Sequence, residues 1–357
     1  MQAHGQMPAP SGAPTTTSGV TAAARSPAAS PSATPTTEQV INSLGEADLQ
    51  AAISLLKSNF TNADAITDTE LKRATLTGLL VRMPGGLVLL PSRENTTSEG
   101  GGQFYSEIFE EHLGYLRLGE LNGANLKELD KKLQEFGQKK VDAAIVDLRT
   151  SSTGDFGTAA DFAKRFCPKG KTLFTVRKPA TRQDRQFTSD RDPAFQGLIV
   201  VLADGDTSGG AEALAAALKL YTKALIIGQS TAGRAVEYSD QPLPSGKILR
   251  VASAEAVLPD GQPLFPGGVK PDLPVEMSEA EKRQIFRLST EKGMGPFVYE
   301  SDRPHLNEAA LIAGTNPELD IPDAQRRLRS RSGQSPRDSV LQRALDVVTS
   351  LEIYQKH

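Results

Sequence analysis

The stretch "ADGDTSGGAEALAAALKLYTKALIIGQSTAGRA", residues Ala203 to Ala235, decides the fold. It begins at the end of a strand, passes through a glycine-rich turn and continues as a helix of small residues. A second strand, "KALIIGQ", then leads into a second glycine-rich turn. Two strands joined by a helix form a unit whose strands lie parallel in one sheet. The stretch therefore predicts two glycine-rich turns close together at one edge of a sheet.

The same alternation of strands and helices precedes this stretch. We predict strands at "LGYLRL", "DAAIVDL", "KTLFTVR" and "GLIVVLAD", and a helix at "DFGTAADFAKRFCP". "NLKELDKKLQEFGQK" is predicted as an amphipathic helix that ends at Gly137. Its apolar face carries Leu126, Leu129, Leu133 and Phe136. This order is typical of the α/β class, with parallel strands covered by helices.

In a parallel sheet the ligand crevice lies at the carboxyl ends of the strands. Three glycine-rich turns follow predicted strands, at Arg149–Gly154, Asp204–Gly210 and Gln229–Gly233. The sequence therefore places a candidate site where these three turns meet.

Composition excludes several classes of function. The formal net charge is −3, which gives no reason to expect nucleic acid or an anionic membrane as partner. The histidines are isolated, at His4, His112, His305 and His357, and the one cysteine is Cys167. We therefore expect no metal, no cofactor and no internal disulfide. No apolar stretch is long enough for a membrane-spanning helix.

Changes in composition divide the sequence into five parts. Residues 1–37, rich in Pro, Ala, Ser and Thr, are expected to be a disordered tether. Residues 38–92 are predicted as an N-terminal helical segment that closes on a short strand, "GLVLLP". Residues 93–112 are predicted as a glycine-rich loop, 113–277 as the α/β core, and 278–357 as a charged helical tail.

An arginine-rich run stands out in that tail. We interpret it as a solvated helix face, with an anion site as the alternative. Its members are Arg326, Arg327, Arg329 and Arg331.

Five motifs, in order, resemble those of the C-terminal processing (tail-specific) serine peptidase family. They are "LGYLRL" at 113–118, "IVDLRTSSTG" at 145–154, "TSGGAE" at 207–212, "IIGQSTAGRA" at 226–235 and "PGGVKPDLPV" at 266–275. The resemblance covers residues 70 to 277 and implies a ClpP/crotonase-like peptidase core. Family members usually carry a PDZ domain before this core. The interval 93–112 is too short for one, so we expect the PDZ domain to be absent.

The resemblance also implies that the catalytic dyad has been replaced. Family members use a serine nucleophile and a lysine base. The nucleophile position falls on Gly209 and the base position on Arg234. A guanidinium stays protonated in proteins, so it cannot act as a general base. The oxyanion region corresponds to Gly154 and Gly210, and only one glycine of the family's Pro-Gly-Gly turn is kept.

Ser208, one residue before the nucleophile position, is the alternative nucleophile. A shift of one residue along a helix rotates a side chain by about 100° around the helix axis, which is enough to point a hydroxyl away from a base. Gly209 and Gly210, which follow Ser208, are flexible and could let the turn shift by one residue. Ser208 would also need a base, and Lys219, Lys223 and His112 are the candidates in the matched segments. The structural interpretation of Ser208 is an N-cap hydroxyl of the following helix or a hydroxyl of the turn before it.

Arg234 has two interpretations as well. Arg234 either forms a structural ion pair with Glu212 or Asp206, or binds a carboxylate of a peptide. Arginine binds carboxylates in a bidentate way. We group Thr207 with Arg234 as a candidate substrate-binding residue. Cys167, before Pro168, is interpreted as buried packing.

These observations favour a pseudo-peptidase that binds extended polypeptide by strand addition without cleaving it. Two alternatives stay open: an active serine endopeptidase that uses Ser208 with a relocated base, and a structural scaffold that binds no peptide. The expected partner is a polypeptide, oligomers are possible, and the expected location is the periplasm or cell envelope, after export.

Overall fold

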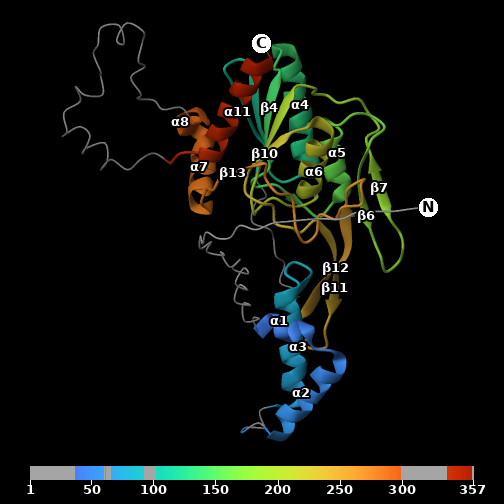
Figure 1. Cartoon of the computed structure of the whole chain (residues 1–357). Coiled ribbons are helices and arrows are strands. Elements are labelled where there is room, and N and C mark those ends of the chain that lie inside the picture. The colour runs from blue at the N-terminus through green and yellow to red at the C-terminus, as the bar shows by residue number, and fades with distance from the viewer. Residues whose placement is uncertain (1–36, 60, 62–65, 92–101, 299–335, 356–357) are drawn as a thin grey trace, which may run out of the picture. The chain divides into compact units, whose positions relative to one another are not determined.

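The computed structural model describes residues 37–59, 61, 66–91, 102–298 and 336–355 (Figure 1). The protein divides into two compact units, residues 1–72 and 73–357. The first unit contains α1 (Thr37–Ser43), α2 (Glu46–Asn59) and the start of α3 (Asp68–Arg82). No residue of α2 is buried, and Lys57 pairs with Asp68 at 2.6 Å. The helices predicted within 38–92 are therefore present.

The centre of the second unit is a six-stranded sheet in the order β13-β10-β8-β4-β3-β2. Its parallel strands are β3 (Leu113–Arg117), β4 (Ala143–Asp147), β8 (Leu198–Ala203), β10 (Leu225–Gly228) and β13 (Leu273–Pro274). Every residue of β3 and β4 is buried, as expected for a parallel sheet covered on both faces. The predicted α/β class is confirmed.

One edge of this sheet differs from the prediction. Residues 105–109 form strand β2 (Tyr105–Phe109), which pairs antiparallel with β3. The predicted loop over 93–112 is therefore wrong for this segment, because its side chains alternate into the core, where Phe109 is 4% exposed. No other domain lies between β2 and β3, which a turn at 110–112 joins.

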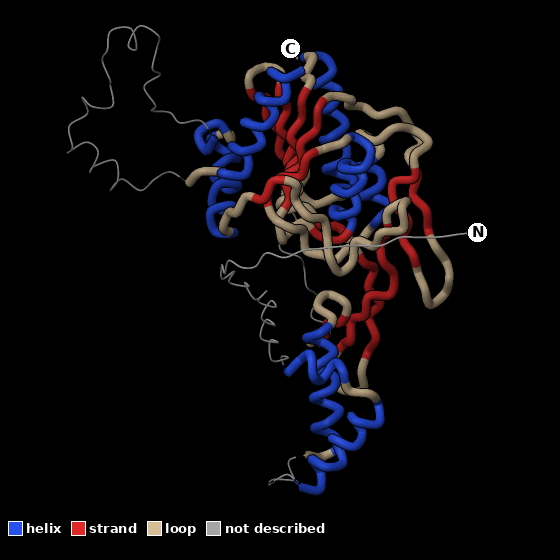
Figure 2. Tube along the Cα trace, viewed as in Figure 1, coloured by secondary structure: helices blue, strands red, loops and turns tan. Residues whose placement is uncertain are grey.

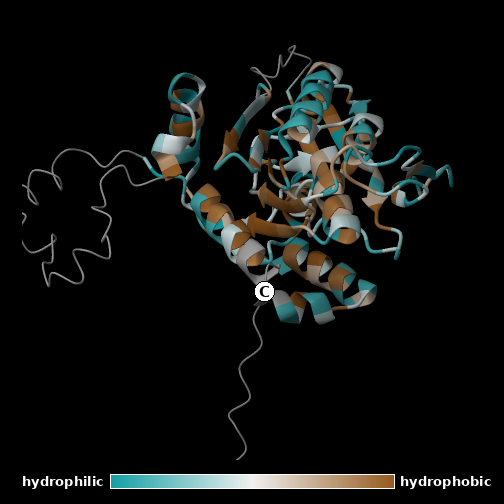
Figure 3. Ribbon diagram, turned by 90° about the horizontal axis from the view of Figure 1, so that it is seen from above, coloured by the Kyte–Doolittle hydropathy of each residue, from teal (hydrophilic) through white to brown (hydrophobic). Residues whose placement is uncertain are grey.

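Helices cover both faces of the sheet (Figures 1 and 3). One face carries α4 (Gly123–Lys139), α5 (Phe156–Ala163) and α6 (Gly210–Thr222). The other face carries α7 (Glu279–Lys292), α8 (Gly295–Val298) and α11 (Ser339–Gln355). Alternate residues of each strand enter the two cores: Leu116 and Val146 face α4–α6, whereas Tyr115 and Ile145 face the C-terminal helices.

The amphipathic helix predicted from "NLKELDKKLQEFGQK" is α4. Leu129, Leu133 and Phe136 are buried on its inner face, and the Asn122 side chain caps its first turn. The helix continues past Gly137 to Lys139 and ends where Lys140 takes a left-handed conformation (φ 57°). The predicted end is therefore two residues too early.

A second, antiparallel sheet of five strands lies beside this core (Figure 2). Its strands are β1 (Leu87–Leu90), β6 (Thr172–Arg177), β7 (Arg185–Thr188), β11 (Val236–Pro242) and β12 (Ile248–Val257). The prediction of "KTLFTVR" as one more parallel strand is wrong. Strand β6 pairs antiparallel with β12 and β7 instead, and its Phe174 packs against Phe156 of α5 and Phe187 of β7.

Buried charges join the C-terminal helices to the carboxyl ends of the central strands. The guanidinium of Arg149, 1% exposed, donates two 2.8 Å hydrogen bonds to Asp338, which precedes α11. It also binds Asp147, and Tyr115 donates to the same carboxylate at 2.7 Å. Burial opposes the charge of Asp147, but Arg149 more than compensates and keeps the pKa of that carboxyl below its ordinary value.

A second charged group of this kind holds α7. The ammonium of Lys282 donates to Asp204, to Asp206 and to the Arg149 carbonyl, at 2.5, 2.6 and 3.0 Å. The predicted tail over 278–357 is thus helical in its described parts and packs on the core. The arginine-rich run lies outside the described residues.

Replacing Asp338 tests how strongly the core holds α11. Asp338→Ala leaves Arg149 buried with one carboxylate instead of two, so we expect a loss of about 3 kcal/mol in the free energy of unfolding. The measurement is urea unfolding followed by circular dichroism. Asp346→Ala, on the exposed face of α11, is the matched control, with an expected change within about 0.5 kcal/mol. Equal changes in the two variants would contradict this role of Asp338.

Candidate functional site

The three glycine-rich turns meet at the carboxyl ends of the central strands. The turn after β4 contains β5 (Ser152–Thr153), and the turn after β8 contains β9 (Ser208–Gly209). These short strands pair in parallel, with Ser152 opposite Ser208 and Thr153 opposite Gly209. The predicted meeting of the turns is therefore present.

A pocket of about 610 Å³ opens at this place. Four residues singled out from the sequence line it: Gly154, Ser208, Gly209 and Arg234. The antiparallel sheet supplies the opposite wall, through residues such as Val88, Tyr238 and Arg250. Glu120 is the one acidic residue among the described residues that line the pocket.

Gly209, which the sequence motifs predict to stand at the nucleophile position, has a backbone that disfavours any side chain. Its φ of 64° lies in the region that glycine adopts readily and other residues avoid. A Cβ atom added here would lie 2.3 Å from the carbonyl oxygen of Thr153. Carbon and oxygen atoms in contact are about 3.3–3.6 Å apart. The space that a nucleophile's side chain would need is therefore filled by backbone.

Glu212 holds the two turns in place. Its buried carboxylate accepts hydrogen bonds from the backbone N–H groups of Gly209, Gly233 and Arg234, at 3.0, 2.8 and 2.7 Å. The Thr231 hydroxyl donates a fourth bond at 2.6 Å. Burial raises the pKa of Glu212, and these hydrogen bonds partly offset the rise. One carboxylate thus fixes both dyad positions through their backbones, a role that the sequence did not reveal.

The ion pairs predicted for Arg234 are wrong. Glu212 accepts from the backbone N–H of Arg234, not from its guanidinium, and Asp206 pairs with Lys282. Across the part of the protein that the structure describes, the guanidinium of Arg234 forms no hydrogen bond or ion pair.

Two further assignments need correction. Thr207 is fully buried and donates its hydroxyl to the Leu148 carbonyl at 2.8 Å, so it is structural and does not face the pocket. Gly210 is the first residue of α6, and a Cβ atom there would lie 2.8 Å from that of Ala159. Its glycine lets α6 approach α5. Gly210 is not among the residues that line the pocket.

Ser208 lines the pocket without a base. The residue that caps α6 is Gly209, so the predicted capping role of Ser208 is wrong. Lys219 pairs with Asp272 on the surface, and Lys223 ends α6. His112 precedes β3, at the opposite end of the parallel strands. No basic nitrogen hydrogen-bonds to the Ser208 hydroxyl within the described ranges.

Other reactive groups lie elsewhere. Cys167 is buried, which raises the pKa of its thiol to about 12, as expected of a packing residue. Among the residues with described placement, no three His, Cys, Asp or Glu side chains gather as a metal site would require. None of the described helices is long and apolar enough to cross a membrane.

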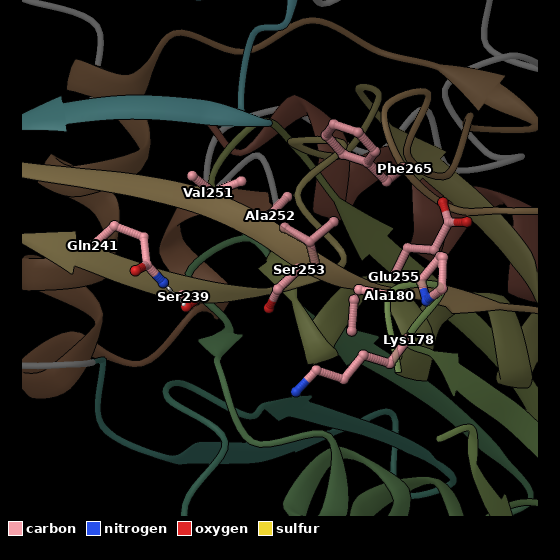
Figure 4. A pocket seen from close by; sticks show the side chains of 12 residues that line it. Lys178, Ala180, Ser239, Gln241, Val251, Ala252, Ser253, Glu255 and Phe265 are labelled. Carbon is pink, nitrogen blue, oxygen red and sulfur yellow. Dashed lines mark hydrogen bonds between the residues drawn. The ribbon is translucent and has the colours of Figure 1, made fainter. Parts of the chain in front are cut away.

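A second pocket, of about 550 Å³, lies beside β11 and β12 (Figure 4). Ser239, Gln241 and Ser253 project into it, with Lys178 and Phe265 at its sides. Side chains alternate across a strand, so Asp240 and Arg250 lie on the other face, toward the first pocket. The second pocket contains none of the site residues predicted from the sequence.

Comparisons with known proteins agree with the motifs. Residues 112–275 match the model of peptidase family S41. A carboxyl-terminal-processing protease of Synechocystis sp. is 28% identical over 164 residues, which are 46% of this chain and 38% of that protein. A chloroplastic carboxyl-terminal-processing peptidase of Arabidopsis thaliana is 26% identical over 45% of this chain and 33% of its own length. The protein thus spans under two-fifths of these relatives.

A solved structure shows the same fold at lower identity. The structure of a putative peptidase from Parabacteroides merdae aligns with a TM-score of 0.50 and 16% identity, over 66% of this chain and 84% of that one. With its α/β core and its motifs in order, the match identifies residues 112–275 of this chain as a peptidase S41 domain.

Proposed function

We propose that this protein is a pseudo-peptidase, which binds extended polypeptide in the crevice of an S41 core and does not cleave it. The observation that carries the proposal is the pair of residues at the dyad positions. Gly209 has no side chain and no room for one, and Arg234 cannot give up its proton.

The loss of the nucleophile is built into the backbone. A serine at position 209 would need Thr153 to move away, and Thr153 is held there by the pairing of β5 with β9. Ser208 does not compensate, because a serine attacks only when a base accepts its proton. Lys282 of α7, whose ammonium is buried, already donates to three oxygens.

The binding half of the proposal rests on the open pocket and its sheet. A volume of about 610 Å³ is typical of ligand sites. Strand β1, whose Val88 lines the pocket, pairs only with β12 among the described strands. Its other edge offers backbone N–H and C=O groups to an added strand. The scaffold alternative would require a crevice filled by side chains, which this open pocket does not favour.

The proposed partner is a polypeptide, in keeping with the processing proteases that this protein resembles. We also propose an exported location in the cell envelope, from the tether predicted over residues 1–37. The endopeptidase alternative finds no support in the geometry around Ser208.

The first test is peptidase activity. Because the dyad is lost, wild type and Ser208→Ala are expected to leave unfolded casein intact to the same degree, as measured by gel densitometry over a day. Trypsin, a general endopeptidase, serves as positive control for the substrate. Cleavage by wild type that disappears in Ser208→Ala would establish Ser208 as the nucleophile and overturn the proposal.

The second test restores the dyad. We expect Gly209→Ser/Arg234→Lys to remain inactive and to lose about 2 kcal/mol or more of unfolding free energy, because serine is strained at positive φ and its Cβ meets Thr153. Gly123→Ser is the control, since a Cβ atom there meets nothing within 4 Å. A stable double variant that cleaves casein would show that the loop adapts and that only two side chains separate this protein from a protease.

A further inference from the structure

Arg234 is held firmly at one wall of the pocket. Its backbone N–H donates to the buried Glu212 at 2.7 Å. The preceding Gly233 adopts φ 63°, where a Cβ atom would lie 2.0 Å from the Pro266 carbonyl oxygen. The aliphatic stem of Arg234 passes over Gly85, so close that a Cβ atom on Gly85 would lie 3.2 Å from Cγ. The stem is therefore packed while the guanidinium stays at the pocket.

The other arginine of the pocket and two acidic residues of the turns already have partners. Arg250, the other arginine of the pocket, binds Asp240 with two hydrogen bonds of 2.7 and 2.8 Å. Asp206 and Glu212 have the partners described above. Within the described residues, Arg234 is thus the lining cation that lacks a carboxylate partner. A guanidinium presents five N–H donors in a planar fork, whose geometry matches that of a carboxylate.

The rest of the lining indicates what kind of anion fits. Ser152 and Ser208 contribute hydroxyl groups, and Val88 and Val236 contribute apolar surface. Glu120, the acidic member of the lining, repels a second negative charge. The pocket therefore suits a single carboxylate attached to a neutral or apolar peptide segment.

We propose that Arg234 binds a carboxylate of the polypeptide that occupies the crevice, so that the family's base position has become an anion-binding site. The carboxylate is that of the polypeptide's C-terminus or of an aspartate or glutamate side chain. This inference rests on the proposed binding of polypeptide and adds its point of attachment.

The test uses three fluorescent peptides of one apolar sequence with the full-length protein. The first has a free C-terminus, the second an amidated C-terminus and one internal aspartate, and the third an amidated C-terminus and no acid. Binding is measured by fluorescence anisotropy for wild type, Arg234→Gln and Arg283→Gln. Arg283 is an exposed arginine of α7 that pairs with Glu279, outside the pocket, and is the matched control.

We expect wild type to bind at least one acidic peptide about tenfold more tightly than the neutral one, as charge-assisted hydrogen bonds predict. Arg234→Gln removes this preference and leaves binding of the neutral peptide unchanged, while Arg283→Gln behaves as wild type. Preference for the first peptide identifies the C-terminal carboxylate, and preference for the second identifies the aspartate side chain. Equal binding of all three by wild type overturns the inference but leaves the proposed function standing.

A small probe separates the two proposals. Sodium propionate is titrated while the Nε–H signal of Arg234, assigned by its absence in Arg234→Lys, is followed by nuclear magnetic resonance. A saturating shift together with no peptide binding would overturn the binding of polypeptide and keep the carboxylate site. No shift, together with binding that Arg234→Gln does not change, would overturn the carboxylate site alone.

Discussion

The close approach of the Thr153 carbonyl oxygen to Gly209 leaves no room for a side chain at position 209. A side chain at position 209 and the present pairing of β5 with β9 exclude one another. Gly209 therefore differs from a serine in more than the hydroxyl group, because the loop after β4 occupies the space that a side chain would need. In the proposed alignment with the family, Arg234 stands at the base position, and its guanidinium carries a permanent charge and has no lone pair to accept a proton.

Buried carboxylates hold the turns and the C-terminal helix around the site in place. Glu212 ties the two glycine-rich turns through three backbone N–H groups, so the backbones of Gly209 and Arg234 are held in place. Asp147 and Asp338 share the guanidinium of Arg149, and this joins the C-terminal helix to the sheet. Such a frame keeps a pocket open, and a cation facing an open pocket is suited to binding an anion.

Much of the fold could be predicted from the sequence, because the spacing of apolar residues indicates which side chains are buried. The continuous apolar runs of β4 and β8 and the spacing of Leu129, Leu133 and Phe136 identify their elements directly. Motif spacing likewise brought Gly154, Ser208, Gly209 and Arg234 to one pocket. Strand partners were less predictable: the sequence of β6 is that of a buried strand, but β6 pairs antiparallel with β12 and β7 in the second sheet.

The detailed geometry of the site depends on contacts between residues that are far apart in the sequence. Glu212 is one of many acidic residues in the sequence, and only the folded protein shows which backbone groups it accepts from. The partner of Asp206 comes from α7, 76 residues further along the sequence. Arg234 forms neither of the ion pairs predicted for it, with Glu212 or with Asp206.

A crystal structure of the protein with a bound peptide tests the central claim most directly. We predict an intact peptide across the pocket, one of its carboxylates on Arg234, and the Thr153 carbonyl still against Gly209. A cleaved peptide, or an ester between the peptide and Ser208, would contradict the assignment as a pseudo-peptidase.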